Sequence, residues 1–296
     1  MAPKEIAGTL LRGMGQIMLQ DNALTGALFL LGILANSWQM FLAALLGVAS
    51  GTAAACLLKY GKDDISRGLY GFNAALVGVG LLFFFQPGIT LAILIIAGAA
   101  LSSMLMNFMH KRKMAPYTFP FILSTWLIIA LAGATGILSS QPPSPAAPLS
   151  LDILSSLSMG ASQVMFQASI LTGIIFFAAI FVNSRTNAIY ALLGSLVGAL
   201  LALALSFPLP LISIGIFGYN GVLCGAAFAG SKKHAFLFAI AATALSVLLV
   251  RALPFIGIPA LTAPFVFATW AMLALGKKFQ TLTFAAQAKP SSNKGA

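Results

Sequence analysis

Residues 71–78 read Gly-Phe-Asn-Ala-Ala-Leu-Val-Gly, and residues 218–225 read Gly-Tyr-Asn-Gly-Val-Leu-Cys-Gly, an offset of 147 positions (218 minus 71). A second block, Thr-Phe-Pro-Phe at 118–121, returns as Thr-Ala-Pro-Phe at 262–265, offset by 144. Further matches at the offset of 147 are Gln16 with Gln163, Gln20 with Gln167, and Leu-Thr-Gly at 24–26 with the same triplet at 171–173. Matched blocks in one order predict two halves of one architecture. In membrane proteins, such halves usually enclose one site at their interface.

The composition is that of a membrane protein. Hydrophobic residues make up 60% of the 296 residues, charged residues only 7%, and the mean hydropathy is +1.00. A soluble domain carries about a quarter charged residues. Apolar runs such as 28–35, 89–100 and 235–250 lack the polar stripe of a surface helix. Because a bilayer crossing takes about 20 helical residues, we expect an all-α integral membrane protein with about ten transmembrane helices.

Glycine, proline, asparagine and charged residues divide the chain into ten apolar segments. The expected spans are 22–36, 38–58, 68–86, 88–109 and 117–138 in the first half, and 170–183, 186–206, 211–230, 234–253 and 260–276 in the second. We therefore predict a first repeat at 1–138, a proline-rich external linker at 139–150, and a second repeat at 151–279. Residues 280–296 are expected to form a disordered cytoplasmic tail.

Lysine and arginine predict the orientation. With the N-terminus cytoplasmic, fifteen of the sixteen basic residues fall inside, and Arg251 is the exception. Both termini are then cytoplasmic, and the uncharged linker is external. Five spans per half make the second repeat inverted relative to the first, with the pathway between them near mid-membrane. We interpret the net charge of +11 as topology signals, not as a patch for nucleic acid or anionic lipid.

The segments before the first span of each half are too polar to cross a bilayer. Residues 6–20 and 153–167 each contain two glutamines at the same spacing and then run into Thr-Gly and an apolar stretch. A re-entrant half-helix fits this pattern, because irregular backbone at membrane depth must line a cavity or pack within protein. An interfacial amphipathic helix is the alternative.

Several kinds of active site find no support in the sequence. The five acidic residues all lie near the ends of expected spans or in loops, so a proton or sodium relay lacks its usual carboxylates. The histidines, His110 and His234, lie beside lysines at span borders. We find no metal-ligand spacing, nucleophile elbow, phosphate loop or Asn-Pro-Ala motif. We therefore expect no enzyme, no cofactor and no metal.

The repeated blocks instead carry neutral polar and aromatic side chains. Each Thr-x-Pro is expected to open a span, with proline in the first turn. For Thr118 and Thr262, helix capping and pore lining both remain open. Asn73 and Asn220 follow an aromatic residue after a glycine, where a helix would kink or break. We expect their side-chain amides to satisfy backbone groups freed at that break.

These motifs together resemble the urea transporters, in particular the bacterial urea channels. The resemblance rests on Gly-Gln-x-x-x-Gln before Thr-Gly, on Tyr-Gly-Phe-Asn-x-x-Leu-Val-Gly, and on the paired Thr-x-Pro-Phe-x-x-x-Thr-Trp blocks. It covers about residues 8–278. It implies a homotrimer in which every protomer holds a narrow slot, walled by apolar and aromatic side chains and lined by oxygens from re-entrant helices.

Carried over by position, the resemblance implies the pore residues. It places Gln16 and Gln163 on the re-entrant helices beside the slot, and Thr118 and Thr262 at its constriction. The implied walls are Phe72, Leu76, Tyr219 and Leu223, with apolar contacts from Ile17 and Val164. This chain departs from the common pattern in having Leu at 19, Gln at 163, Ala-Ser at 168–169 and Tyr at 219. These departures bear on the choice between urea and a close amide analogue.

The expected function is therefore facilitative transmembrane transport through a channel. Urea, and short amides with it, would pass down its gradient across the bilayer of a bacterial inner (plasma) membrane, with no nucleic-acid partner. A planar solute with four N–H donors needs oxygens to replace lost water, since an unpaired polar group in apolar surroundings costs several kcal/mol. Several weak sites in series let it enter and leave. A secondary-active transporter of a small neutral solute is the alternative.

Overall fold

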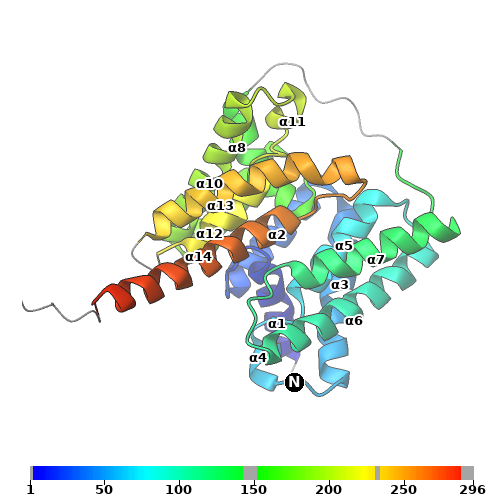
Figure 1. Ribbon diagram of the computed structural model, residues 1–296. Coiled ribbons are helices and arrows are strands. Elements are labelled where there is room, and N and C mark those ends of the chain that lie inside the picture. Colours follow the sequence, from blue (N-terminus) through cyan, green and yellow to red (C-terminus); the bar gives the residue numbers. More distant parts are fainter. Residues whose placement is uncertain (1–2, 143–151, 231–233, 288–296) are drawn as a thin grey trace, which may run out of the picture.

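The computed structural model describes residues 3–142, 152–230 and 234–287, and side chains as far as Lys277. Every regular element within these ranges is a helix, and the only β pairing there is an isolated bridge between Phe85 and Ser140. The all-α prediction is confirmed. The helices of residues 3–142, the first half, gather on one side in Figure 1, and most of those of residues 152–287, the second half, gather on the other.

The helices follow the apolar segments closely. Those of the first half are α1 (Pro3–Gln16), α2 (Ala23–Asn36), α3 (Trp38–Leu57), α4 (Lys62–Ser66), α5 (Phe72–Phe84), α6 (Ile89–Lys111) and α7 (Phe119–Thr135). Those of the second half are α8 (Ile153–Ser162), η1 (Gln163–Met165), α9 (Ile170–Asn183), α10 (Arg185–Ala204), α11 (Leu209–Ser213), α12 (Tyr219–Phe228), α13 (Ala235–Ala252), η2 (Leu253–Ile256) and α14 (Ala263–Gln287). Each expected span thus contains a helix.

Four described helices are long and apolar enough to cross a membrane. They are Trp38–Leu57, Ile89–Lys111, Arg185–Ala204 and Ala235–Ile256. A fifth candidate is the pair Ile153–Met165 and Ile170–Asn183, which is bent by 77°. Four of the other expected spans correspond to shorter apolar helices, which are Ala23–Asn36, Phe72–Phe84, Phe119–Thr135 and Ala263–Lys277. The expected span 211–230 contains the ten-residue helix Tyr219–Phe228. The fold is therefore that of a helical protein with several membrane-spanning segments.

The structure also describes parts of the two segments that lie outside the predicted repeats. Helix α14 continues to Gln287, so residues 280–287 are helical where a disordered tail was predicted. The predicted linker begins at 139, but Gln86 N–H donates to Ser139 O and Gln141 N–H donates to Phe84 O. Its first residues thus pair with the end of α5. The rest of the linker and of the tail lies outside the described residues.

Both halves use the same local conformations at equivalent positions. Left-handed backbone occurs at Leu19 (φ 60°) and at its repeat equivalent Phe166 (φ 59°). Side-chain caps recur as well: Asn22 accepts a hydrogen bond from Thr25 N, and Ser169 accepts one from Thr172 N. Such residues are favoured at helix N-termini because their oxygens satisfy N–H groups that the helix leaves unpaired. The sequence repeat is therefore also a repeat of local structure.

The helix that precedes the first span packs closely on that span in each half. A Cβ added to Gly26 of α2 would lie 1.7 Å from Leu11 O of α1. A Cβ added to Gly173 of α9 would lie 2.0 Å from Ser158 O of α8. Only glycine permits such close backbone contact. The tight pairing, with the bend between α8 and α9, is consistent with the predicted re-entrant helices.

Reciprocal hydrogen bonds join the halves through α2 and α9. Thr25 Oγ1 donates to Ala179 O at 3.0 Å, and its equivalent Thr172 donates to Gly32 O at 2.9 Å. The buried Gln20 accepts from Asn183 at 2.7 Å, and the buried Gln167 accepts from Asn36 at 2.8 Å. Each bond recurs with the halves exchanged, so α2 and α9 form a nearly symmetric junction.

Replacing Gly26 by Ala should destabilise the protein by about 3 kcal/mol or more, because the new methyl group meets backbone that cannot rotate away. Gly133→Ala in α7 is the matched control, since a Cβ there meets nothing within 4 Å. We expect this control to be neutral or to gain about 0.5–1 kcal/mol from helix propensity. Thermal unfolding of the purified protein, followed by size-exclusion chromatography, measures both. Equal melting temperatures for the two variants would contradict the close packing.

Candidate functional site

The two Thr-x-Pro-Phe blocks meet at the junction between the halves. Thr118 and Thr262 are buried, and their Oγ1 atoms share a hydrogen bond at 2.6 Å. The Trp126 indole donates to Pro259 O at 2.9 Å, and its equivalent Trp270 donates to Ala115 O at 2.8 Å. The two repeat-related threonines thus contact each other, and each of the two repeat-related tryptophans donates to a carbonyl of the opposite half. The threonine pair lies where the two halves meet.

Asparagine side chains satisfy the first turns of α7 and α14. Asn73 Oδ1 accepts from Phe121 N at 3.0 Å, and Asn220 Oδ1 accepts from Phe265 N at 3.0 Å. Thr118 itself makes no side-chain capping bond to α7. Asn73 and Asn220 therefore satisfy backbone groups, as expected, but at the starts of α7 and α14 and not at the break beside their own glycines. Their bonds leave the Thr118 hydroxyl available for the opposite threonine.

The carbonyl that precedes each threonine is satisfied differently in the two halves. In the first half, Asn73 Nδ2 donates to Tyr117 O at 3.2 Å. In the second half, the hydroxyl of Tyr219 donates to Leu261 O, the equivalent carbonyl. The hydroxyl of Tyr219 therefore has a structural role, and Phe72 needs no hydroxyl because Asn73 satisfies the equivalent carbonyl.

A cavity of about 310 Å³ opens beside the threonine pair. Four predicted site residues line it, which are Gln16, Ile17, Phe72 and Thr118. Apolar and aromatic side chains form most of the remaining wall, among them Leu19, Leu69, Met106, Tyr117 and Phe265, and His110 also lines it. The cavity thus combines apolar walls with a carboxamide and a hydroxyl. Tyr117 and Phe265 were not predicted, although Tyr117 adjoins one repeated Thr-x-Pro-Phe block and Phe265 ends the other.

The other predicted site residues lie outside the lining of this cavity. Leu76, Val164 and Leu223 are buried in the core, and Tyr219 is buried with them. Thr262 reaches the site through its bond to Thr118. Leu19 lines the cavity, whereas its equivalent Phe166 packs on other aromatic rings, with centroid distances of 5.0 Å to Phe83 and 6.3 Å to Phe121. The site is therefore open beside Leu19, whereas aromatic side chains pack around the equivalent residue Phe166 of the second half.

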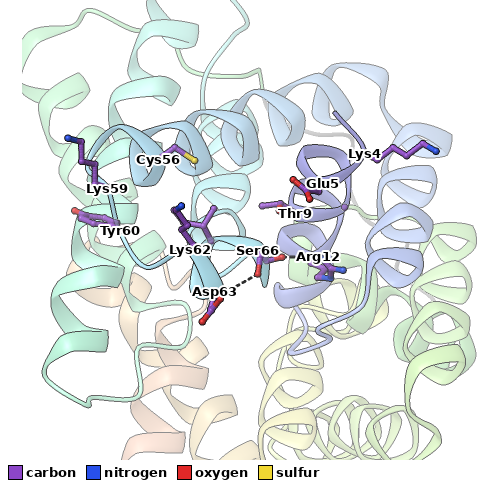
Figure 2. Close-up of a pocket in the computed structure, with 12 residues that line it drawn as sticks. Lys4, Glu5, Thr9, Arg12, Cys56, Lys59, Tyr60, Lys62, Asp63 and Ser66 are labelled. Carbon is purple, nitrogen blue, oxygen red and sulfur yellow. Dashed lines mark hydrogen bonds between the residues drawn. The ribbon is translucent and has the colours of Figure 1, made fainter. Parts of the chain in front are cut away.

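A larger cavity, of about 970 Å³, lies elsewhere, between α1, the end of α3 and α4 (Figure 2). None of the predicted site residues lines it. Charged side chains surround it, in contrast to the mostly apolar wall beside Thr118. Its size alone does not connect it with the repeated architecture of the two halves.

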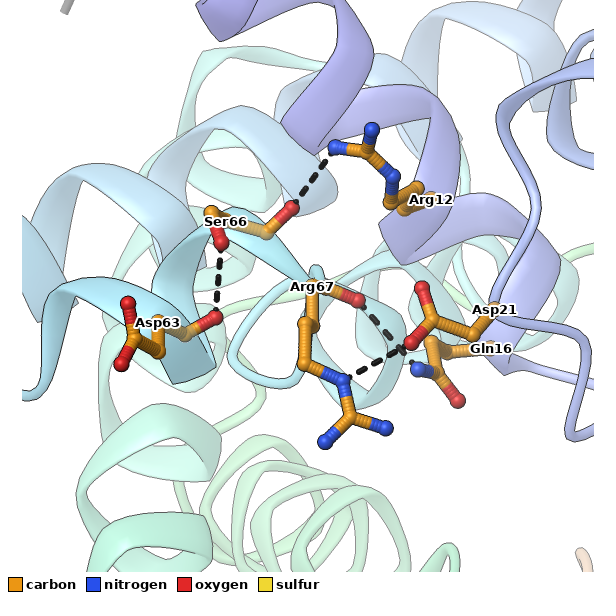
Figure 3. Close-up of polar contacts among 6 residues, drawn as sticks. All are labelled: Arg12, Gln16, Asp21, Asp63, Ser66 and Arg67. Atoms are coloured by element: carbon orange, nitrogen blue, oxygen red, sulfur yellow. Dashed lines mark hydrogen bonds and ion pairs between the residues drawn. The ribbon is translucent and has the colours of Figure 1, made fainter.

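The carboxamides of Gln16 and Gln163 are held in the same way. Gln16 Nε2 donates to Arg67 O at 3.2 Å, and Gln163 Nε2 donates to the equivalent Ile214 O at 3.0 Å. These bonds use the amide nitrogen and leave the carbonyl oxygen as an acceptor. In Figure 3 the oxygen of Gln16 points away from Arg67.

Asp21 fixes the position of Arg67 in turn. Arg67 Nε lies 2.8 Å from Asp21 Oδ2, and this hydrogen bond raises the pKa of the guanidinium above its ordinary value (Figure 3). The arginine therefore stays charged throughout the physiological pH range. Among the described residues, no group of three His, Cys, Asp or Glu side chains could hold a metal ion. The site offers hydrogen-bonding oxygens and apolar walls.

Comparison with known proteins gives a consistent result. The family model described as urea transporter matches residues 7–277. Urea transporter 1 of Rattus norvegicus is 30% identical over 238 residues, which cover 75% of this chain and 62% of that protein. Urea transporter 1 of Ovis aries is 28% identical over 296 residues, covering 90% of this chain and 76% of that protein. The chain therefore spans less than two thirds of the rat protein's length.

The asparagine caps give a prediction about stability. Asn73→Ala removes the acceptor for Phe121 N–H and the donor to Tyr117 O, and each unsatisfied buried group costs about 1–3 kcal/mol. Tyr219→Phe serves as the control, because it removes one bond and leaves the Asn220 cap intact. We expect Asn73→Ala to lower the melting temperature clearly more than Tyr219→Phe does. A larger loss in Tyr219→Phe would show that the caps matter less than the tyrosine hydroxyl.

Proposed function

The chain belongs to the urea transporter family, and we propose that it is a facilitative channel that passes urea, and short amides with it, down a gradient. The family consists of transport proteins, not enzymes. The observation that carries the proposal is the cavity beside the paired hydroxyls of Thr118 and Thr262. We infer that a pore runs from this cavity past the threonines, within a single protomer.

The chemistry of the cavity suits a flat, uncharged amide. The oxygens of Gln16 and Thr118 can accept the N–H groups of a solute that has lost its water. One hydroxyl hydrogen of the threonine pair is used between the two residues, and the other is free to meet a carbonyl oxygen. Ile17 and Phe72 offer only apolar surface. Hydrated ions would lose far more solvation than these groups can replace.

The pore beyond the threonine pair is proposed to use the second-half residues. By the repeat, Gln163, Val164, Tyr219 and Leu223 are the counterparts of Gln16, Ile17, Phe72 and Leu76. A path between the halves would pass Leu76 and Leu223 before reaching Gln163. Weak sites in series of this kind allow a solute to leave as readily as it enters.

We further propose ten spans in two inverted repeats, with residues 1–138 and 151–279 as the repeats. The reciprocal contacts support this arrangement, because a two-fold axis pairs residue i with j and residue j with i. Cytoplasmic termini follow from the basic residues, and an inner-membrane location and a homotrimer rest on the family resemblance. A short re-entrant helix before each first span would bring Gln16 and Gln163 to the pathway.

Proteoliposomes containing the purified protein test the function. We expect rapid shrinkage followed by urea entry in stopped-flow light scattering, slower entry of acetamide, and little entry of glycerol. Urea flux should not change with a protonophore or with removal of sodium. Accumulation of urea against its gradient, driven by either ion, would replace the channel with a secondary-active transporter.

Removing one hydroxyl of the threonine pair should slow urea entry. Thr118→Val and Thr262→Val keep the shape of the side chain and delete an oxygen, so we expect urea permeability to fall about five- to tenfold, the equivalent of one hydrogen bond. Thr243→Val is the matched control, because Thr243 is a buried threonine of α13 outside the cavity. Wild-type urea permeability in both pore variants would make the threonine pair purely structural.

Shortening the aromatic wall should change selectivity. Phe72→Ala widens the cavity, so we expect the ratio of glycerol to urea permeability to rise. Phe29→Ala is the control: Phe29 is fully buried and packs on Phe176, with ring centroids 4.8 Å apart. It should cost about 3–5 kcal/mol of stability and lower all permeabilities together. An unchanged ratio in folded Phe72→Ala protein would remove Phe72 from the pore wall.

The proposed topology places the linker outside the cell. Ala146 lies in the linker, outside the described residues. Ala146→Cys, made in a Cys56→Ser background, should react with a membrane-impermeant thiol reagent added to intact cells. A cysteine at Lys113, in a loop proposed to be cytoplasmic, should react only after lysis. The reverse pattern would invert the orientation.

A further inference from the structure

Basic side chains outnumber acidic ones in the lining of the 970 Å³ cavity. Lys4 and Arg12 come from α1, Lys59 comes from the connection between α3 and α4, and Lys62 begins α4 (Figure 2). Arg12 donates to Ser66 O at 3.0 Å. The acidic residues in the lining are Glu5 and Asp63, so positive charge exceeds negative by two. A ligand that is complementary to this rim carries negative charge.

An apolar cavity continues from the basic rim along α3. It measures about 340 Å³ and shares Thr9 and Cys56 with the charged cavity. Its other lining residues are Ile6, Leu10, Ala49, Thr52 and Ala53. From Ala49 to Cys56 the groove follows α3 for about two turns, or roughly 10 Å. Because α3 is one of the candidate membrane spans, this groove runs from a basic helix end along membrane-spanning surface.

Two buried hydroxyls in the groove have no partner. Thr9 is 1% exposed and Thr52 is 8% exposed, and the Oγ1 atom of each lies within the described structure without a hydrogen bond. Both residues line the apolar cavity. An unmade hydrogen bond in such surroundings is costly. Both oxygens are themselves covered, so a ligand in the groove would contact the apolar parts of Thr9 and Thr52.

The second half provides an internal comparison. The positions equivalent to Ala49, Ala53 and Cys56 on α3 are Leu196, Leu200 and Leu203 on α10. The larger leucines add bulk where α3 has small side chains. The equivalents of Lys59 and Lys62 are the uncharged Ser206 and Leu209. Ser156, the equivalent of Thr9, donates its hydroxyl to Ile212 O. The groove, its charge and its unpartnered hydroxyl are therefore features of the first half that the repeat does not require.

We propose that this groove binds one anionic phospholipid. Its phosphate lies at the rim of the charged cavity on the side of Lys59 and Lys62, and one acyl chain lies along α3 between Ala49 and Cys56. Basic pockets at helix ends bind acidic headgroups at this level of a membrane. A soluble phosphate has nothing to fill the apolar groove, and the C-terminal tail, with Lys289 and Lys294, is repelled by the rim. The basic residues of this cluster thus act as a binding site as well as a topology signal.

Lipid binding to the purified full-length protein can be measured by native mass spectrometry and through Cys56. Cys56 is exposed in the groove, and Cys224 is buried, so the alkylation rate of Cys56 reports on occupancy without mutation. The probes are phosphatidylglycerol, phosphatidylcholine of the same chain length, and inorganic phosphate, each added to the protein in neutral detergent. We expect phosphatidylglycerol to bind and to slow alkylation, with little effect from the other two.

Three variants separate the charge from the groove. Removing the charges in K59Q/K62Q should weaken phosphatidylglycerol binding at least about tenfold, since each lysine near a headgroup contributes roughly a fivefold factor. Ala53→Leu, which copies the second half, should have a similar effect while keeping every charge. The control K111Q/K113Q removes two charges at the end of α6 and should bind as the wild type does.

The proposal is overturned if phosphatidylcholine binds equally well, if inorganic phosphate alone protects Cys56, or if the α6 control loses as much affinity as the lysine variant. A change in oligomeric state of Ala53→Leu, with lipid binding intact, would assign the groove to a second copy of the chain and also overturns it. Urea permeability is a separate readout: loss of lipid binding with wild-type urea entry leaves the channel proposal standing.

Discussion

The constraint behind this structure is that backbone polar groups away from water need partners inside the protein. Both Thr-x-Pro-Phe segments begin a helix within the core, where the first N–H groups have no carbonyl within the same helix. Asn73 and Asn220 reach across from α5 and α12 and accept from Phe121 and Phe265. Because the asparagines satisfy these helix starts, the threonine hydroxyls can face each other, and a polar pair can exist at the junction of the halves.

The same constraint explains why glycines and reciprocal bonds occur together. Gly26 and Gly173 bring each preceding helix into backbone contact with the following one, which leaves the buried carboxamides of Gln20 and Gln167 beside the opposite half. Those carboxamides accept from Asn183 and Asn36, and the threonines of the two Thr-Gly pairs donate across the same junction. Each half thus supplies hydrogen-bonding groups that the other half needs, which makes the two halves one folding unit.

Sequence reasoning predicted what depends on repeated blocks and apolar length. Each expected span contains a helix, although α14 runs on to Gln287, and the asparagines satisfy backbone groups. It did not predict α4 and α11, which are helices of five residues and too short to show a helical period. Nor did it predict that Leu19 lines an open cavity while Phe166 packs against Phe83 and Phe121. Both residues have left-handed backbone, so the difference depends on side-chain volume and neighbours, which periodicity does not encode.

The differences between the halves are as informative as the matches. At the junction, equivalent residues keep their hydrogen-bonding type, because each partner must satisfy the other half. Where the two halves differ at the junction, another side chain replaces the missing bond. The hydroxyl of Tyr219 donates to Leu261 O in the second half, whereas Asn73 donates to the equivalent Tyr117 O in the first. Around α1 and α3, small and basic residues replace large and neutral ones without such compensation, and two hydroxyls stay unpartnered. The duplicated fold does not require that asymmetry, which is the reason for proposing a ligand from outside the protein on that side.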